Sequence, residues 1–149
     1  MSESKKVLYK RATASDSLLE LMNRITFMDT DYDVPIEIKD VIIYGSYAKG
    51  AKKVHDLDVF INGIEHREEY PNFLLLHGKN PQYTVANCSF VFDCMARYFK
   101  GNSKLISIHC NMSGQADDGE LEIALSEDHY YLLKDGKLNY DAIDELLSM

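Results

Sequence analysis

A chain of 149 residues, of which 46% are hydrophobic and 27% charged, has room for one globular domain with a core and little room for a second. Its formal net charge of -8 argues against binding along extended nucleic acid, since that association needs clustered Lys and Arg. Three cysteines without a Cys-x-x-Cys pair argue against a zinc ribbon or a disulfide framework. Because no stretch approaches ~20 apolar residues and no apolar signal begins the chain, we expect a cytoplasmic protein without a membrane span.

The N-terminal part predicts a loose arm followed by a helix. Residues 1 to 14 are polar and lack periodicity, so a single domain is expected over residues 15 to 149. Ser17 and Glu20 match a capping box, in which both side chains satisfy free backbone donors at a helix start. The acidic stretch Asp29 to Pro35 predicts a loop after the helix. The apolar residues that share one helical face are Leu18, Leu21, Met22 and Ile25.

Two strands are predicted in the middle of the chain. Val41 to Tyr44 is a β-branched run that stops at Gly45 and predicts a buried strand. Ser46 to Ala51 predicts a turn that enters a short helix, and Asp56 to Ile61 predicts the second strand. Since side chains alternate along a strand, one face of this second strand should carry Asp56, Asp58 and Phe60, and the other Leu57 and Val59.

A helix and a third strand are predicted next. Apolar residues recur at helical spacing from Val85 to Phe99, and Gly101 occupies the position of a C-cap glycine. Asp93 and Arg97 would form an exposed ion pair on this helix. Leu105 to Cys110 then predicts a strand.

Hydrophobic alternation over Leu121 to Leu125 predicts a half-buried fourth strand, whose wet face would carry Glu120 and Glu122. A hairpin is expected around Asp135-Gly136, because this pair supplies the positive φ angles of a tight turn. Asp141 to Leu147 predicts a closing helix. The expected fold is α+β, a small mixed β-sheet with helices mainly on one face. The arms of the hairpin are Tyr130 to Leu133 and Lys137 to Tyr140.

The segment from Val41 to Ile61 carries the chemistry. Its buried strand leads to Gly45 and Ser46, where a glycine lets the backbone approach a ligand closely. The following turn would present free N–H groups, which favour an anion. Ser46 adds a hydroxyl, and positive charge close by comes from Lys49, Lys52 and Lys53. These features predict a phosphate-binding turn.

A pair of carboxylates follows this turn. Asp56 and Asp58 project from one strand face, where they repel each other unless a cation lies between them. Hard oxygen ligands beside a phosphate site are those that Mg²⁺ prefers. A phosphate-binding turn facing two carboxylates indicates metal-assisted phosphoryl or nucleotidyl transfer.

This arrangement resembles a known family. Gly45-Ser46, nine intervening residues and Asp56-Leu57-Asp58-Val59 resemble the signature of the DNA polymerase beta-like nucleotidyltransferase superfamily. Gly45-Ser46-Tyr47-Ala48-Lys49-Gly50 also resembles the Gly-Ser-x-Ala-Arg-Gly version of minimal nucleotidyltransferases, with Lys49 in place of the arginine. The resemblance implies Mg²⁺-dependent transfer of a nucleoside monophosphate from a nucleoside triphosphate, such as ATP, to an acceptor hydroxyl.

The same resemblance implies roles for particular residues. Gly45, Ser46 and Lys49 would hold the phosphates, and Asp56 and Asp58 would bind the metal ions. A third carboxylate on a later strand usually completes such a site. For this position Glu122 is preferred, Asp93 would serve if its segment were a strand, and His109 is a substitute if no acid is present.

Several properties stay open at the level of sequence. The resemblance implies a nucleoside triphosphate substrate and either a partner protein or a homodimer that completes the acceptor pocket. An alternative is a catalytically silent nucleotide-binding or protein-interaction module of the same fold, motivated by the uncertain third carboxylate. A metal-binding hydrolase, which would release a free nucleotide, is a third interpretation.

Overall fold

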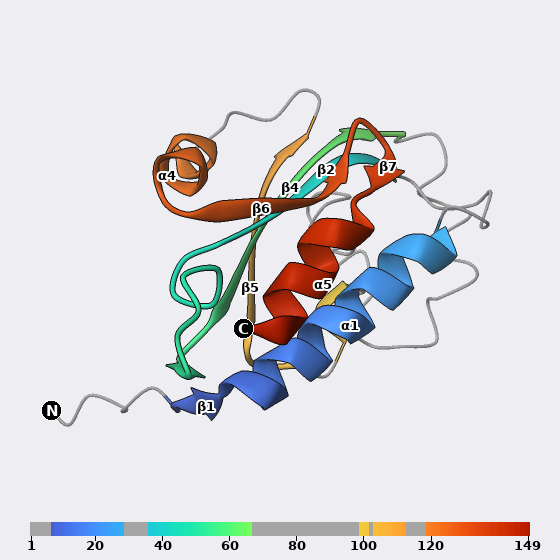
Figure 1. The fold of residues 1–149 in the computed structure, drawn as a ribbon. Coiled ribbons are helices and arrows are strands. Elements are labelled where there is room, and N and C mark those ends of the chain that lie inside the picture. Colours follow the sequence, from blue (N-terminus) through green and yellow to red (C-terminus); the bar gives the residue numbers. More distant parts are fainter. Residues whose placement is uncertain (1–6, 29–35, 67–98, 102, 113–118) are drawn as a thin grey trace, which may run out of the picture.

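The computed structural model describes residues 7–28, 36–66, 99–101, 103–112 and 119–149, and has an α+β architecture (Figure 1). This class confirms the coarse form of the fold expected from the sequence. In chain order the elements are β1 (Tyr9–Lys10), α1 (Arg11–Met28), β2 (Ile36–Tyr44), β3 (Lys53–Val54), β4 (Leu57–Glu65), β5 (Ile106–Met112), α4 (Glu120–Ser126), β6 (His129–Lys134), β7 (Lys137–Leu138) and α5 (Tyr140–Ser148).

The larger sheet has five strands in the order β5-β4-β2-β6-β7. Strands β4 and β5 run parallel, and the other neighbouring pairs run antiparallel, so the sheet is mixed as expected. Strands β1 and β3 form a separate two-stranded sheet. The antiparallel register places Tyr44, the last residue of β2, opposite Asp58 near the start of β4.

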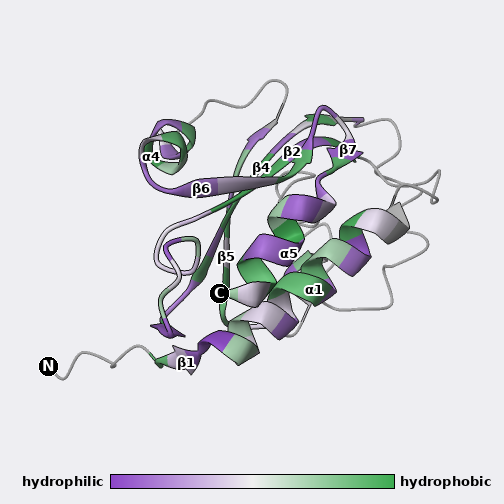
Figure 2. Cartoon of the chain, viewed as in Figure 1, coloured by the Kyte–Doolittle hydropathy of each residue, from purple (hydrophilic) through white to green (hydrophobic). Residues whose placement is uncertain are grey.

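The main core lies between one face of the five-stranded sheet and the two helices α1 and α5, which lie side by side (Figure 1). Both helices carry hydrophobic and hydrophilic residues around their axes, as amphipathic helices do (Figure 2). Helix α4 covers part of the opposite face, where Ala124 packs with Ile42, Tyr44 and Phe60. Two of the three helices that the described ranges contain therefore share one face, and α4 lies on the other.

The face assignment predicted for the second strand is confirmed from Leu57 to Phe60, whereas Asp56 lies just before β4 (Leu57–Glu65) and outside the strand. Leu57 and Val59 of β4 belong to the main core. Phe60 is fully buried in the smaller cluster under α4. This alternation leaves Asp58 on the same sheet face as Phe60, beside α4 and away from the main core.

Helix α1 begins earlier than the sequence predicted. The expected arm reached residue 14, whereas Tyr9 and Lys10 form β1 and the helix starts at Arg11. Ser17 and Glu20 therefore lie inside α1 and are not a capping box. The apolar stripe already includes Ala14, which is fully buried one helical turn before the first predicted core residue.

The segment Leu121 to Leu125 is helical, which contradicts the predicted strand. It lies within α4, where Ala124 is buried while Ile123 and Leu125 are 47% and 42% exposed. Alternating hydrophobicity over so few residues fits the period of a helix as well as that of a strand, and Glu, Leu and Ala favour a helix. Glu120 and Glu122 therefore do not share the face of a strand.

Other expectations from the sequence agree with the structure. Strand β5 matches the predicted third strand closely, and α5 matches the closing helix. Asp135 and Gly136 have φ angles of 51° and 79°, as the predicted hairpin turn requires. Gly101 has a φ of 55° directly after the helical residues Phe99 and Lys100.

Two predictions fall on residues that the structure does not describe. These are the loop from Asp29 to Pro35 and the helix from Val85 up to residue 98, with Asp93 and Arg97. Among the helices that are described, none is both long and apolar enough to cross a membrane.

Candidate functional site

The Gly-Ser turn begins where β2 ends. Gly45 is buried and has a φ of 79°, a backbone conformation that residues with a Cβ atom adopt with strain. The chain then folds back on itself: Lys49 N donates to Gly45 O (3.2 Å), and Ala51 N donates to Ser46 O (3.1 Å). These bonds form a tight turn, and the short helix expected after Ser46 is not present.

The turn offers donors to a ligand. Within the described part of the chain, the backbone N–H groups of Ser46, Tyr47 and Ala48 donate no hydrogen bond. Of these three residues Ser46 is exposed, whereas Tyr47 and Ala48 are buried, so the N–H and hydroxyl of Ser46 are the donors open to solvent. Consecutive backbone N–H groups at the start of such a turn attract an anion, because each carries a partial positive charge. The turn is therefore suited to binding a phosphate group.

Asp58 lies directly against this turn. A Cβ atom added to Gly45 would collide with Oδ2 of Asp58 and would come within 3.3 Å of its Cγ. The close approach is possible only because residue 45 is a glycine. Antiparallel pairing of Tyr44 with Asp58 produces this contact, since it fixes the start of β4 beside the end of β2.

The surroundings of Asp58 are acidic. Burial raises the pKa of its carboxyl group, and the nearby charge of Asp56 raises it further, while His109 offsets part of the effect. Glu127 and Glu120 also act to raise it. The side chain of Asp58 forms no hydrogen bond or ion pair with another residue in the described ranges. A cation at this position would relieve the repulsion between these carboxylates.

Glu120, the first residue of α4, is the acid that α4 brings to this sheet face. Its Oε2 accepts a hydrogen bond of 2.9 Å from the Tyr44 hydroxyl, and it lies 4.0 Å from Nε2 of His109 on β5. Burial raises the pKa of the Tyr44 phenol far above its usual range, and Glu120 adds to this effect. The phenol therefore stays protonated and keeps Glu120 turned toward the sheet.

The sequence missed Glu120 as a site residue. The preferred third carboxylate, Glu122, is exposed on α4, whereas Glu120 contacts Tyr44 and acts on Asp58. In a strand, residues two apart share a face, but in a helix they point in different directions. The strong helix formers of α4 were the signal that could have separated these two acids. Asp93 lies outside the described residues, and His109 is close to Glu120.

The predicted lysines are all exposed. Nζ of Lys49 lies 3.9 Å from Oε1 of Glu127, so Lys49 is held at the edge of the acidic cluster. Lys52 follows the turn, and Lys53 belongs to β3. Of these three lysines, Lys49 is the one that a contact places near Asp58. Its partner Glu127 also raises the pKa of Asp58.

The carboxylates near the turn do not form a complete protein cage for a metal ion. In the residues that the structure describes, no group of three or more His, Cys, Asp or Glu side chains is arranged to hold one. Mg²⁺ is commonly bound by one or two carboxylates together with water and substrate phosphates. Asp56 and Asp58 fit this kind of site, because they supply hard oxygen atoms close to each other and Asp58 lies beside the Gly-Ser turn.

Comparisons with known proteins give no further identification. No protein-family model matches the chain, and no curated protein is significantly similar to it.

Proposed function

We propose that this protein is a metal-dependent nucleotidyltransferase of the DNA polymerase beta-like type, close to the minimal nucleotidyltransferases. It would transfer a nucleoside monophosphate from a nucleoside triphosphate to an acceptor hydroxyl and release pyrophosphate. The observation that supports this proposal is the contact between Asp58 and Gly45. It brings a half-buried carboxylate to the side of a turn in which the exposed Ser46 can donate to phosphate.

The turn would hold the triphosphate. The N–H group and the hydroxyl of Ser46, which is exposed, can donate to phosphate oxygens. Lys49 can move from Glu127 to the phosphates, because an exposed pair 3.9 Å apart is weak. Donors fixed by the fold need little reorganisation during the reaction, which favours the transition state over the free substrate.

Asp56 and Asp58 would hold Mg²⁺. When bound, this ion supplies positive charge that stabilises the attacking and leaving oxygens of an in-line displacement. The pKa of Asp58 is raised first by burial and then by the charge of Asp56, so the two carboxylates repel each other in the absence of the ion. The partial burial of Asp58 beside Gly45 strengthens electrostatic contacts in the site, because solvent screening is lower there.

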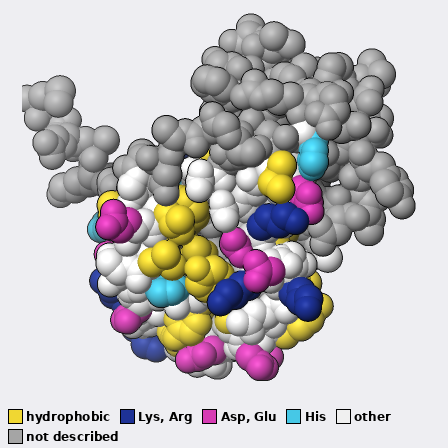
Figure 3. Space-filling view, turned by 90° about the horizontal axis from the view of Figure 1, so that it is seen from above, with side chains coloured by type: hydrophobic (Ala, Val, Ile, Leu, Met, Phe, Trp, Pro, Cys, Tyr) yellow, Lys and Arg dark blue, Asp and Glu magenta, His cyan; other side chains and the backbone are white. Residues whose placement is uncertain are grey.

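The acceptor side of the site would include Glu120 and His109. Both can accept a proton from a hydroxyl group, and they lie on the sheet face that also carries Asp58. On the surface shown in Figure 3, Lys and Arg side chains alternate with Asp and Glu and form no continuous basic patch. This distribution disfavours extended nucleic acid and favours a small acceptor, a partner protein or a second copy of the chain.

The test measures Mg²⁺-dependent pyrophosphate release from each of the common nucleoside triphosphates, with and without candidate acceptor proteins. Asp58→Asn should abolish release, lowering it by roughly 10³-fold or more, since it removes a metal ligand that acts in the transition state. Asp144→Asn is the matched control, because Asp144 is an exposed carboxylate on α5 and belongs to neither the turn nor the acids that act on Asp58. Unchanged activity in Asp58→Asn would overturn the proposal.

The second candidate is a catalytically silent nucleotide-binding module. The described residues contain no group of three metal ligands, which favours this alternative. Such a module would bind Mg²⁺ and triphosphate without releasing pyrophosphate in any condition. A metal-dependent hydrolase would instead produce free nucleotide without labelling an acceptor. A reducing cytoplasm suits each of these functions.

A further inference from the structure

Among the residues that the structure describes, Arg11 is the one charged residue that is buried, and its exposed fraction is 7%. It is the first residue of α1, and its backbone N–H donates to the carbonyl oxygen of Lys52, directly after the Gly-Ser turn (2.8 Å). A buried guanidinium is costly to desolvate, so its contacts must compensate that cost. Those contacts lead to the candidate site.

The guanidinium binds the Gly-Ser turn from behind. Nη1 donates to the carbonyl oxygens of Tyr47 (2.7 Å) and Ala51 (3.1 Å). The guanidinium carbon also lies 4.0 Å from the centre of the Tyr47 ring, which gives a cation–π contact. On its other side Nη2 donates to the carbonyl oxygen of Leu146 at the end of α5 (2.9 Å). Arg11 therefore joins the turn to the C-terminal helix.

The charge of Arg11 is not neutralised by an acid. In the described ranges, no carboxylate lies within ion-pair distance of its guanidinium. The negative partners are carbonyl dipoles, including the C-terminal end of α5, which carries a partial negative charge. An apolar residue in place of a buried ion is often neutral or stabilising, so packing alone is a poor explanation for an arginine here.

The contacts also orient the peptide groups of the turn. In a planar trans peptide the C=O and N–H bonds point in opposite directions. Because the Tyr47 carbonyl points at Arg11, the N–H of Ala48 points away from it, and this N–H donates no hydrogen bond within the described residues. The Tyr47 ring is fixed as well, since its hydroxyl lies 2.7 Å from Oγ of Ser15. Arg11 thus fixes the direction of the peptide group between Tyr47 and Ala48.

We infer that Arg11 is a positioning residue for triphosphate binding, which it supports by fixing the Gly-Ser turn and by placing an unneutralised positive charge behind it. This inference rests on the proposed function, and it adds a residue that touches neither metal nor phosphate. In a poorly screened interior, such a charge acts over a longer distance than a surface lysine does.

The experiment compares Arg11→Met and Arg11→Lys with the wild type and with Arg24→Met. Arg24 is the matched control, because it also lies on α1 and donates to a backbone carbonyl, that of Phe99 (3.2 Å). The affinity for inorganic tripolyphosphate is measured well below the melting temperature of each variant. Arg11→Met should weaken it by roughly 10- to 100-fold, as expected for residues that orient a first layer of ligands. Arg11→Lys should lose less, because it keeps the charge, and Arg24→Met should match the wild type.

A structural role alone would lower the melting temperature of both Arg11 variants and leave the affinity of the folded protein unchanged, and this result would overturn the inference. Failure of the wild type to bind tripolyphosphate would instead reject the proposed function. In that case amide hydrogen exchange decides the positioning role. Arg11→Met should speed exchange at Lys49, Gly50 and Ala51 more than in the β6–β7 hairpin, and uniform exchange would reject it.

Discussion

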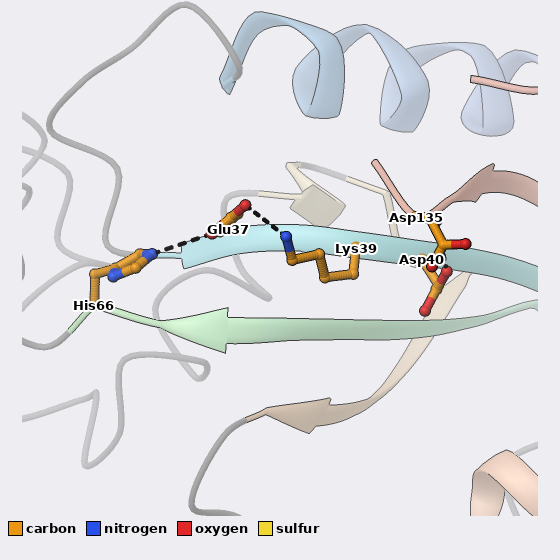
Figure 4. A network of polar contacts seen from close by, with 5 residues as sticks. All are labelled: Glu37, Lys39, Asp40, His66 and Asp135. Carbon is orange, nitrogen blue, oxygen red and sulfur yellow. Dashed lines mark hydrogen bonds and ion pairs between the residues drawn. The ribbon is translucent and has the colours of Figure 1, made fainter. Parts of the chain in front are cut away.

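The two ends of β2 carry charges in opposite arrangements. At the Ile36 end, acidic and basic groups alternate and pair with one another: Lys39 Nζ lies 2.7 Å from Glu37, and His66 lies 3.6 Å from the same carboxylate (Figure 4). At the Tyr44 end, the carboxylates of Asp56 and Asp58 act against each other. The first arrangement is complete within the protein, whereas the second favours an added cation.

The Ile36 end has a structural explanation. Asp40 accepts hydrogen bonds from the side chain of Asn62 (3.0 Å) and from the backbone N–H of Asp135 (3.1 Å), so it fastens the β6–β7 hairpin to β2. The hydrogen bond and charge of Lys39 lower the pKa of the Glu37 carboxyl, which is the usual effect of an exposed ion pair. Two clusters of charged residues at the ends of one strand can therefore differ in role. The direction of the pKa shift distinguishes them, because the pKa is lowered at Glu37 and raised at Asp58.

The largest effect is expected from Gly45→Ala compared with Gly136→Ala. Both glycines have a φ of 79°, but a Cβ at Gly136 meets nothing within 4 Å, while one at Gly45 collides with Asp58. The positive φ should cost each variant about 1–2 kcal/mol of unfolding free energy. The collision should bring Gly45→Ala to about 2–5 kcal/mol, as overpacking does. Urea unfolding measures both, and equal losses would contradict the contact with Asp58.

The next effect concerns the acid on α4. Glu120→Gln keeps an acceptor for the Tyr44 hydroxyl but removes the charge. If Glu120 acts on the acceptor, the rate of pyrophosphate release should fall by roughly 10²-fold, the lower range for general base catalysis. Glu122→Gln is the control on the same helix, because Glu122 is exposed. Equal rates for the two variants would remove Glu120 from the site.

A smaller effect is expected in the stability of Asp58→Asn. Because the pKa of Asp58 is raised in the folded protein, ionisation favours the unfolded chain, and stability falls as pH rises through the interval between the two pKa values. Asp58→Asn should therefore melt a few degrees higher than the wild type at neutral pH, where 1 kcal/mol corresponds to about 2–4 °C. The difference should vanish below about pH 4, where the carboxyl of the unfolded chain is also protonated.

Magnesium provides the check on this stability difference. If Asp58 is a ligand of Mg²⁺, as proposed, the ion should raise the melting temperature of the wild type and leave that of Asp58→Asn unchanged, because a ligand that binds only the folded state stabilises it. The same response in both proteins would show that Mg²⁺ acts elsewhere.

The smallest effect is expected at the Ile36 end. Glu37→Gln removes the partner of Lys39 and His66, but these groups are exposed and screened by solvent. Neither the melting temperature nor triphosphate binding should change measurably. A loss of triphosphate binding in Glu37→Gln would contradict the view that the Ile36 end of β2 is structural and that the proposed ligand site lies at the Tyr44 end.

The sequence predicted the parts of the site that depend on local geometry. The spacing of residues along the chain indicated both the strand that stops at Gly45 and the position of Asp58 near the start of the next strand. It could not locate Glu120, since hydrophobic alternation over α4 fits two periods. Arg11 fell within the predicted loose arm, because its burial depends on carbonyl groups of Tyr47 and Leu146, far away in the chain.

The irregularity in β2 between Ile38 and Asp40 affects how the strand tolerates changes in length. Ile36 and Ile38 face the main core at even positions, whereas Val41 and Ile43 face it at odd ones, so one residue is extra. Removing Lys39 would restore regular alternation and keep every core residue inside. Loss of a residue elsewhere in β2 would shift the alternation, so that the core side chains at one end of the strand would point away from the core. The loss of a residue at this point should therefore leave the Gly45 end undisturbed.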